Sequence, residues 1–574
     1  MTVPVPPQAL SAAAVEELAR LIGIDVGGEA LERVAAGAAT AAAAVRAVLA
    51  SGADGGLFMR EPADYLPLLE SFAPAVVASP SSAPAAPLRR LATSTPSQSA
   101  ILALDLTALD LTALVEALAL RRLRSVDLVR AALERAARLH ARTRCFLRID
   151  DVQAIRQAEL ADLLLDEALR AGRSDERSLL GVPLAHKDMF LRAGEIASFG
   201  SRVPTPRPVT RSATVLQRLD AAGAVSLGAL HMAEFALGPT GHNATMGDCR
   251  NAWNEDYISG GSSSGSAVAV AGGAVAASLG SDSGGSVRIP AAVNGVFGLK
   301  PTYGLVPRTA SMKLSPSIDV IGLFARSVRD LALMLGIVAG GDGQDGQCSL
   351  RPLPDYRDAS ARGVEGLRVG VPRNYFLDDL DSAVQAAFER SLAVFEAAGT
   401  RVVSIEVPDV DAMAELSRAV VYAEATALHA SWLRSAAARY SPQVRVRAST
   451  GLAIPAPLYL EALQLRLPLL ERFVAWVFGR CDVLLTPTLP LRTPRRDETD
   501  VGAGPELWRT LGRLVRCTAP FNYLGLPALS MPAGVDDRGL PLGMQIIAAP
   551  FAETTLLRCA SAHERAHPCR PQIL

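Results

Sequence analysis

The chain has 574 residues, of which 49% are hydrophobic and 20% charged, and its 57 basic and 58 acidic side chains give a net charge of −1. This composition excludes an intrinsically disordered chain, because it supplies enough apolar surface for a large core. A charge near zero, without a local basic patch, also argues against nucleic acid or an anionic membrane as a partner.

Residues 1–73 are predicted to form a small all-helical unit. Between residues 11 and 71, apolar side chains recur at helical spacing: Val15, Leu18, Leu21, Ile22, Leu31, Val34, Ala38, Ala42, Val45 and Leu49. Residues 74–100 are rich in Pro, Ala, Ser and Thr, a composition that cannot supply a packed face and that predicts a linker. We therefore place a domain boundary there and assign residues 101–574 to the main domain.

The main domain alternates strand-like apolar runs with helical runs, which predicts an α/β fold with a mixed central β-sheet flanked by helices. A tandem LDLTA at 104–108 and 109–113 leads into helices, one of which we expect Ser125 to cap. The expected helices are 213–222, 266–271 and 382–398. The expected strands are 182–185, 224–227, 274–279, 367–371, 401–407, 483–485 and 543–547. Residues 412–479 are expected to be mostly helical and to cover a site.

The cysteines and histidines predict neither disulfides nor a metal site. Seven cysteines are scattered without a CxxC pair, and of the seven histidines only His563 and His567, in a polar tail, are four apart. No basic stretch precedes an apolar run near residue 1, and no apolar run approaches the ~18 residues of a membrane span. We therefore expect reduced thiols, no metal and a cytoplasmic location.

Residues 259–302 have a composition that ordinary folding does not require: SGGSSSGSAVAVAGGAVAASLGSDSGGSVRIPAAVNGVFGLKPT. Clustered glycines let backbone N–H groups converge on a ligand, and interleaved serines supply nucleophiles and donors. A flexible linker would not contain the apolar runs AVAVA and VAASL. A phosphate-binding loop would need GxxxxGK[ST] or GxGxxG after a strand, and neither is present. The segment therefore predicts a serine-based catalytic site.

A serine nucleophile requires a base. A Ser–His–Asp arrangement is weakly supported, because no acid and histidine follow Ser264 in a recognisable context. The lysines near the segment are Lys187, Lys300 and Lys313. Lys187 follows the apolar run GVPLA, where burial would lower its pKa from about 10.4. The residues alone leave two roles open for it, a buried base or a surface residue paired with Asp188.

Several ordered motifs resemble the amidase signature family, serine hydrolases with a Ser–cis-Ser–Lys triad. They are GVPLAHKDMF, GGSSSGS, GSDSGGSVRIPAAVNGVFGLKPTYG, DVLLTPTLP and FNYLGLPALSMPAG followed by GLPLGMQIIA. The resemblance implies Ser286 as nucleophile, Ser262 as the bridging cis serine and Lys187 as base. It also implies an oxyanion hole formed by the backbone N–H groups of Ser283, Gly284, Gly285 and Ser286. The chain has Ser264 where the family usually has Gly, and Ser281 and Ser283 where it usually has Thr.

The resemblance implies an amidase without cofactor that hydrolyses the C–N bond of a small amide, or of a carbamoyl or urea-like compound, through an acyl-enzyme. The alternative is the glutaminase (A-type) subunit of a tRNA-dependent amidotransferase, which supplies ammonia to a partner. The N-terminal unit is weakly similar to the small helical C subunit of such amidotransferases, and an unrelated helical appendage is equally open. Homo-oligomer formation is left open, and 412–479 is the expected substrate-selecting region.

Other residues have competing interpretations. Asp282 and Arg288 are expected to hold the nucleophile turn rather than to contact substrate. His242 as an acid/base catalyst and Cys249 as a nucleophile are weaker alternatives. Four apolar residues are equally candidates for an acyl pocket and for the core: Met189, Phe190, Phe235 and Leu237. Five residues of the helical region receive no role from the sequence: Tyr422, Glu424, His429, Arg445 and Arg447.

Overall fold

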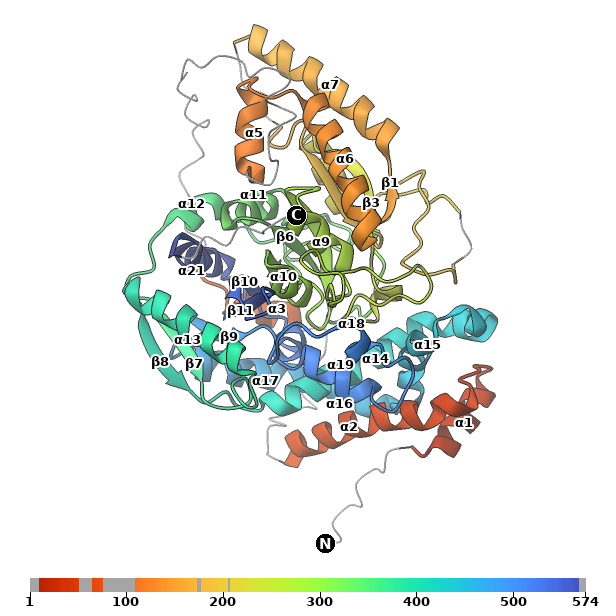
Figure 1. Cartoon of the computed structure of the whole chain (residues 1–574). Coiled ribbons are helices and arrows are strands. Elements are labelled where there is room, and N and C mark those ends of the chain that lie inside the picture. Colours follow the sequence, from red (N-terminus) through yellow and green to blue (C-terminus); the bar gives the residue numbers. More distant parts are fainter. Residues whose placement is uncertain (1–9, 51–64, 76–108, 173–176, 205–206, 567–574) are drawn as a thin grey trace.

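The fold is built on one long mixed sheet with helices around it (Figure 1). A computed structural model describes residues 10–50, 65–75, 109–172, 177–204 and 207–566. Eleven strands follow the order β1-β3-β2-β4-β6-β5-β10-β11-β9-β7-β8. The predicted fold class is therefore confirmed. The predicted linker and the first LDLTA copy lie almost entirely outside the described residues. Within these ranges, no helix combines the length and hydrophobicity that a bilayer crossing requires.

The sheet is antiparallel in its middle and has a parallel group of strands on each side, and the edge strand β1 pairs antiparallel with β3. Strand β2 runs parallel to both β3 and β4, and β7 runs parallel to β8 and β9, whereas β4, β6, β5, β10, β11 and β9 pair antiparallel in turn. The strands are β1 Phe146–Ile149, β2 Pro183–Lys187, β3 Val225–Leu230, β4 Ala277–Asp282, β5 Phe297–Lys300, β6 Val320–Ala325, β7 Arg368–Pro372, β8 Arg401–Ile405, β9 Val483–Pro487, β10 Ala528–Val535 and β11 Pro541–Ala548.

Helices surround the sheet, and several of those that follow β8 gather in a separate layer with the N-terminal helices (Figure 1). Those before β6 are α1 Ala12–Leu21, α2 Leu31–Ala50, α3 Tyr65–Ser71, α5 Leu111–Ala119, α6 Ser125–Thr143, α7 Asp151–Arg170, α8 Thr214–Ala221, α9 Ser264–Ala271 and α10 Arg288–Asn294. Those after it are α11 Val328–Val338, α12 Tyr356–Ala361, α13 Ser382–Ala397, α14 Val410–Ala436, α15 Pro442–Ser449, α16 Ala456–Gln464, α17 Arg466–Phe473, α18 Arg496–Thr499, α19 Leu507–Val515, α20 Ala519–Tyr523 and α21 Glu553–Ala566.

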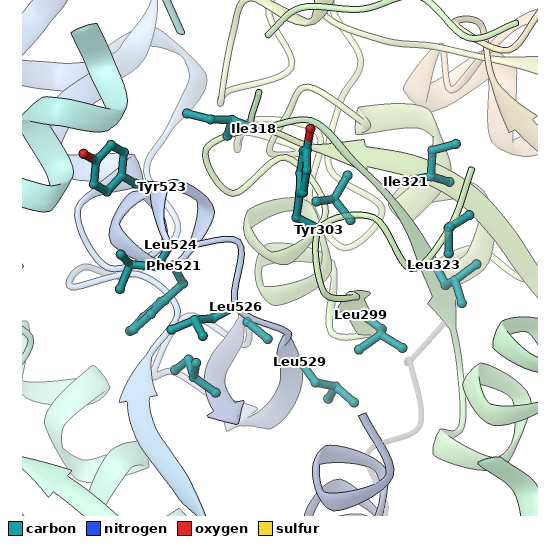
Figure 2. Packing of buried hydrophobic residues seen from close by; sticks show 14 of the residues in the cluster. Leu299, Tyr303, Ile318, Ile321, Leu323, Phe521, Tyr523, Leu524, Leu526 and Leu529 are labelled. Carbon is teal, nitrogen blue, oxygen red and sulfur yellow. The ribbon is translucent and has the colours of Figure 1, made fainter. Parts of the chain in front are cut away.

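Figure 2 shows part of the main core, where side chains of β5, β6, β10 and α20 meet. Leu299, Leu323, Phe521 and Leu529 are all fully buried there. Because β6 pairs with β4 along its whole length, this core also fixes the strand that carries the Gly/Ser segment.

Ser125 does not cap the helix that follows it. It is the first residue of α6, and its Oγ donates to the carbonyl of Gly181 at 2.8 Å. The carboxylate of Asp162, on α7, accepts instead from the N–H groups of Ser125 and Val126 at 2.9 and 3.1 Å. The prediction of a serine cap is therefore wrong, because a carboxylate from a distant helix satisfies the free N–H groups of the first turn.

The N-terminal helices lie against the helices that follow β8 (Figure 1). Helix α2 contacts α14, α15 and α16, and its face with Val34, Ala38 and Val45 is buried. On α1, Val15 is buried, but Leu18 and Leu21 are 38% and 67% exposed, and Ile22 directly after the helix is 45% exposed. The apolar spacing of α1 therefore predicted too wide a buried face, because α1 packs on one side only, against α2 and the turn at 450–453.

Helix α3 docks on the main domain through an arginine enclosed by tyrosines. The guanidinium of Arg466 lies 3.7 Å from the ring centroid of Tyr65, and the Tyr65 hydroxyl donates to the carbonyl of Tyr523 at 3.4 Å. Burial raises the pKa of Tyr65 to about 12. The Arg351 Nη1 also donates to the carbonyl of Glu70 at 2.9 Å. The segment therefore contributes to the stability of the domain.

Tyr65→Ala should lower the free energy of unfolding by about 3 kcal/mol, because it empties a buried aromatic site and removes the ring closest to Arg466. Tyr65→Phe is the matched control and should cost about 1 kcal/mol, since only the hydroxyl is lost. Thermal and urea denaturation measure both variants. A Tyr65→Ala protein as stable as the parent would contradict the docking of α3.

Candidate active site

Lys187 is the last residue of β2 and is fully buried. Its Nζ donates to the Oγ of Ser262 at 2.8 Å and to the Oγ of Ser281 at 2.9 Å. Burial lowers the pKa of this amine to about 7, although the carboxylates of Asp319 and Asp282 act in the opposite direction. A large share of the amine is therefore neutral near pH 7 and able to accept a proton.

The alternative that pairs Lys187 with Asp188 at the surface is wrong. Asp188 accepts instead from the N–H and hydroxyl of Ser198. The other lysines near the segment have different partners: Lys300 donates to the carbonyl of Pro301 at 3.1 Å, and Lys313 to that of Arg308 at 3.4 Å. Lys187 is thus the lysine whose amine meets the serines of the segment.

Ser262 lies directly beside the Lys187 amine and is fully buried. The peptide bond between Gly261 and Ser262 is cis, as the resemblance implied. Gly261 allows the close approach of the Gly238 carbonyl, because a Cβ on Gly261 would lie 2.4 Å from that oxygen. The geometry places a hydroxyl where a proton relay from Lys187 would need one, and the relay itself stays a prediction.

Ser281, which stood out in the sequence only as a serine where the family usually has Thr, is a second partner of Lys187. It lies on β4, next to β2, and its N–H donates to the Oγ of Ser263 at 3.2 Å. The Ser263 hydroxyl in turn donates to the carbonyl of Ser281 at 3.2 Å. These bonds hold the Ser281 hydroxyl toward the lysine, so the amine is oriented by two serines. The sequence signal that could have indicated this role was a serine at the end of a strand, five residues before Ser286.

Asp282 and Arg288 hold the turn that carries Ser286, as predicted. Both side chains are fully buried and joined by two hydrogen bonds, Nη2 to Oδ1 at 3.0 Å and Nε to Oδ2 at 3.1 Å. The arginine also donates to Gln545 and Asn522, which tie the turn to β11 and α20. The Arg288 charge holds the pKa of Asp282 well below its usual range despite burial. The turn is therefore rigid and internally neutralised.

The Asp282 carboxylate also occupies one of the four N–H groups that were predicted to bind the oxyanion, the N–H of Gly285. The N–H of Gly285 donates to Asp282 Oδ1 at 2.7 Å and is engaged there. Gly285 has φ 126°, and a Cβ on it would lie 2.3 Å from the Oγ1 of Thr518, so the turn requires glycine. We keep the N–H groups of Ser283, Gly284 and Ser286 as candidate donors.

A cavity of about 400 Å³ opens beside the half-buried Ser286 and Gly284. Its walls come from the nucleophile turn, from α14, α15 and α19, and from Tyr375. The lining carries two carboxylates, Asp411 and Glu415, and five arginines: Arg418, Arg447, Arg509, Arg513 and Arg516. This excess of positive charge favours an anionic ligand.

Arg447 is the most distinctive of these arginines, because it is only 9% exposed. Its Nε and Nη2 donate to the hydroxyl of Tyr422 at 3.2 and 3.1 Å. Its Nη1 is buried without a hydrogen-bond partner in the described part of the chain. An unpaired buried guanidinium N–H is costly, and a carboxylate oxygen is the partner that it matches best.

Of the five residues of the helical region without a predicted role, Tyr422 and Arg447 line the cavity. Glu424 instead accepts from the hydroxyls of Ser315, Ser317 and Tyr459. His429 bonds the hydroxyl of Tyr440 at 2.8 Å, and Arg445 pairs with Asp25 of the N-terminal unit at 2.9 Å. The four apolar candidates for an acyl pocket are all buried in the main core: Met189, Phe190, Phe235 and Leu237.

The weaker alternatives lose support in the structure. His242 bonds Asp248 and Thr499, each at 3.1 Å. Cys249 is buried, and burial raises the pKa of its thiol well above the usual value, the opposite of what a thiolate nucleophile needs. Among the described residues, six cysteines are buried free thiols, and no group of three or more His, Cys, Asp or Glu side chains could hold a metal ion.

Comparison with known proteins agrees with this geometry. The sequence profile of the Amidase family matches residues 127–557. This chain belongs to the amidase signature family. Enzymes of this family hydrolyse carbon–nitrogen bonds other than peptide bonds. The matched range does not include the N-terminal helices, so their resemblance to a C subunit stays a prediction.

The relatives include both amidotransferase subunits and hydrolases. The A-type subunit of the glutamyl-tRNA(Gln) amidotransferase of Roseiflexus sp. (strain RS-1) is 36% identical over 472 residues, which cover 78% of this chain and 94% of the relative. A structure from a vestigial protein complex, described for the evolutionary origins of an s-triazine catabolic enzyme, has a TM-score of 0.74 at 30% identity and covers 80% of this chain and 99% of its own. The 6-aminohexanoate cyclic dimer hydrolase also has a TM-score of 0.74, at 26% identity, covering 82% of this chain and 99% of its own.

Proposed function

We propose that this amidase hydrolyses the C–N bond of a small amide that carries a carboxylate, through an acyl-enzyme on Ser286. The observation that carries the substrate class is Arg447, a buried cavity-lining arginine with one N–H group unpaired. The observation that supports the reaction is the hydrogen bond from Lys187 Nζ to Ser262 Oγ. Membership of the amidase signature family supports both the role of Ser286 as nucleophile and the relay from Lys187 through Ser262.

In the proposed acylation, neutral Lys187 takes the proton of the Ser262 hydroxyl while Ser262 takes that of Ser286. The Ser286 Oγ attacks the amide carbon, and the N–H groups of Ser283, Gly284 and Ser286 bind the resulting oxyanion. Such donors are worth about 10² to 10³ in rate each in related chemistry. The protonated lysine then returns its proton through Ser262 to the leaving nitrogen. The C–N bond breaks, and ammonia or an amine departs.

Deacylation uses the same groups with water in place of Ser286. Lys187 accepts a proton from water through Ser262, and the hydroxide formed attacks the ester carbon. The bond to the Ser286 oxygen breaks, and that oxygen regains a proton through the relay. The products are a carboxylic acid and the free enzyme. No redox partner or metal is required for the atoms and charges to balance.

Glutamine is a primary amide with a carboxylate, so the proposal includes the second candidate function, a glutaminase subunit. The curated relatives named as A-type amidotransferase subunits favour this candidate over a free-standing amidase. The name of these relatives also includes a tRNA, so the expectation of no nucleic-acid partner stays a prediction. A glutaminase subunit should hydrolyse glutamine and little else, whereas a free-standing amidase should turn over a range of acidic amides.

Arg447→Met should raise KM for carboxylate-bearing amides by about 10- to 100-fold, because it removes a charge-assisted hydrogen bond worth about 1.5–3 kcal/mol. The assay follows ammonia release from glutarate monoamide, glutamine and valeramide, the last a neutral amide of matched length. The parent should prefer the two acids, and the variant should lose that preference while valeramide hydrolysis stays within about twofold. Equal use of acid and neutral amides by the parent protein would contradict the substrate class.

A further inference from the structure

We infer that helix α2 of the N-terminal unit is part of the substrate-selecting machinery, because it positions Trp508 and, through Tyr422, the guanidinium of Arg447. This inference rests on the proposed function, since it concerns the carboxylate subsite of the same cavity. It assigns to Gly37 and Trp508 a positioning role that neither the family match nor the sequence motifs assign. The argument follows a chain of contacts from α2 to the cavity.

The first contact is between α2 and the indole of Trp508, which lines the cavity from α19. The Trp508 Nε1 donates to the carbonyl of Arg33 at 2.8 Å. The ring lies so close to Gly37 that a Cβ there would be 2.7 and 2.9 Å from two indole carbons. A mid-helix glycine lowers helix stability, so the close approach of the indole gives this glycine a packing reason.

The second contact joins Trp508 to Tyr422 on α14. Their ring centroids are 5.3 Å apart with an interplanar angle of 68°, an edge-to-face pair. Tyr422 is 6% exposed, so its ring has little freedom to move independently of the indole. A displacement of Trp508 is therefore transmitted to Tyr422.

The third contact joins Tyr422 to Arg447. The tyrosine hydroxyl accepts from both Nε and Nη2 of the arginine, which fixes the guanidinium plane, and Nη1 is left without a partner among the described residues. Helix α2 also touches the cavity wall directly, because Arg418 Nη1 donates to the Oγ1 of Thr40 at 3.0 Å. Two cavity-lining arginines thus depend on α2 for their placement.

Through these contacts α2 supports the wall of the cavity, although its own residues do not contact the reacting bond. Figure 1 shows α2 lying along the helical layer that contains α14, α16 and α19. A shift of the indole should change how the carboxylate of a substrate is bound without changing the chemistry at Ser286. The signature is a rise in KM for acidic amides at constant kcat.

Gly37→Val tests the inference, because its branched side chain must displace the Trp508 ring. We expect KM for glutarate monoamide to rise about tenfold, with kcat and the hydrolysis of valeramide within about twofold of the parent. Ala36→Val is the matched control, since Ala36 is an exposed neighbour on the same helix, and it should leave all constants unchanged. Trp508→Phe, which keeps a ring but loses the bond to Arg33, should give a smaller rise in KM.

A second readout does not depend on turnover. Isothermal titration of Ser286→Ala with glutarate, a dicarboxylate without an amide, should show weaker binding by about tenfold when Gly37→Val is added. Unchanged KM and unchanged glutarate affinity in a folded Gly37→Val protein would overturn the inference. Loss of kcat for valeramide as well would also overturn it, because it would indicate general damage. An inactive parent protein would instead count against the proposed function.

Discussion

Ser286→Ala should reduce amide hydrolysis by at least about 10⁴-fold, because the proposed reaction has no other group to form the acyl bond. The loss should appear in kcat for acidic and neutral amides alike. Stability should be retained, since Ser286 is half-buried at the cavity and the turn is held by Asp282 and Arg288. Ammonia release and thermal denaturation measure the two effects.

Ser264→Ala is the matched control for that variant. Ser264 belongs to the same Gly/Ser segment and is fully buried, but its Oγ has no hydrogen-bond partner within the described residues. Its loss should leave activity and melting temperature unchanged or slightly improved. Residual hydrolysis above a hundredth of the parent rate in Ser286→Ala would exclude Ser286 as the nucleophile.

Lys187→Met should reduce kcat/KM by about 10²- to 10⁴-fold, the usual contribution of a general base. In the parent, the active form of Lys187 is the neutral amine, and its pKa is lowered to about 7. Log kcat/KM should therefore rise with unit slope as pH increases toward about 7 and become constant above it. Ser262→Ala should lower kcat/KM to a similar extent without unfolding the protein, because it interrupts the proton relay between Lys187 and Ser286.

The buried Lys300 provides the control for the pH profile, since burial also lowers its pKa to about 7. Its amine donates to the Pro301 carbonyl rather than to a serine of the site. Lys300→Met should therefore keep the inflection near pH 7, whereas a shifted or missing inflection would assign the profile to Lys300. Full activity of Lys187→Met at any pH would remove it as the base.

Much of the fold was predictable from local patterns, and two of the missed strands, β6 and β10, have physical reasons. β10 contains Pro532 and β6 contains Gly322, residues that normally argue against a strand. Gly322 is required because a Cβ would lie 2.6 Å from the carbonyl of Leu299. β4 begins three residues later than predicted and ends on Ser281 and Asp282, because the site buries polar residues in the strand.

The site was predictable where the chemistry is local and was missed where it depends on tertiary contacts. The Gly/Ser segment predicted a serine-based site with Lys187 as one candidate base, and the resemblance to the amidase signature family implied Ser262 and Ser286. Arg447 became recognisable only when α14 and α15 brought it to Tyr422, since both look like ordinary helix residues in sequence. The engaged N–H of Gly285 likewise depends on the orientation of the Asp282 side chain, which sequence spacing does not specify.

The central claim is an acyl-enzyme on Ser286, and mass spectrometry of acid-quenched reactions with glutarate monoamide tests it most directly. Trypsin cleavage after Arg250 and Arg288 releases one peptide that contains both Ser262 and Ser286. We predict a glutaryl group on Ser286 in the parent protein and none in the Ser286→Ala variant. A glutaryl group on Ser262, or steady turnover in which this peptide is never acylated, would contradict the account.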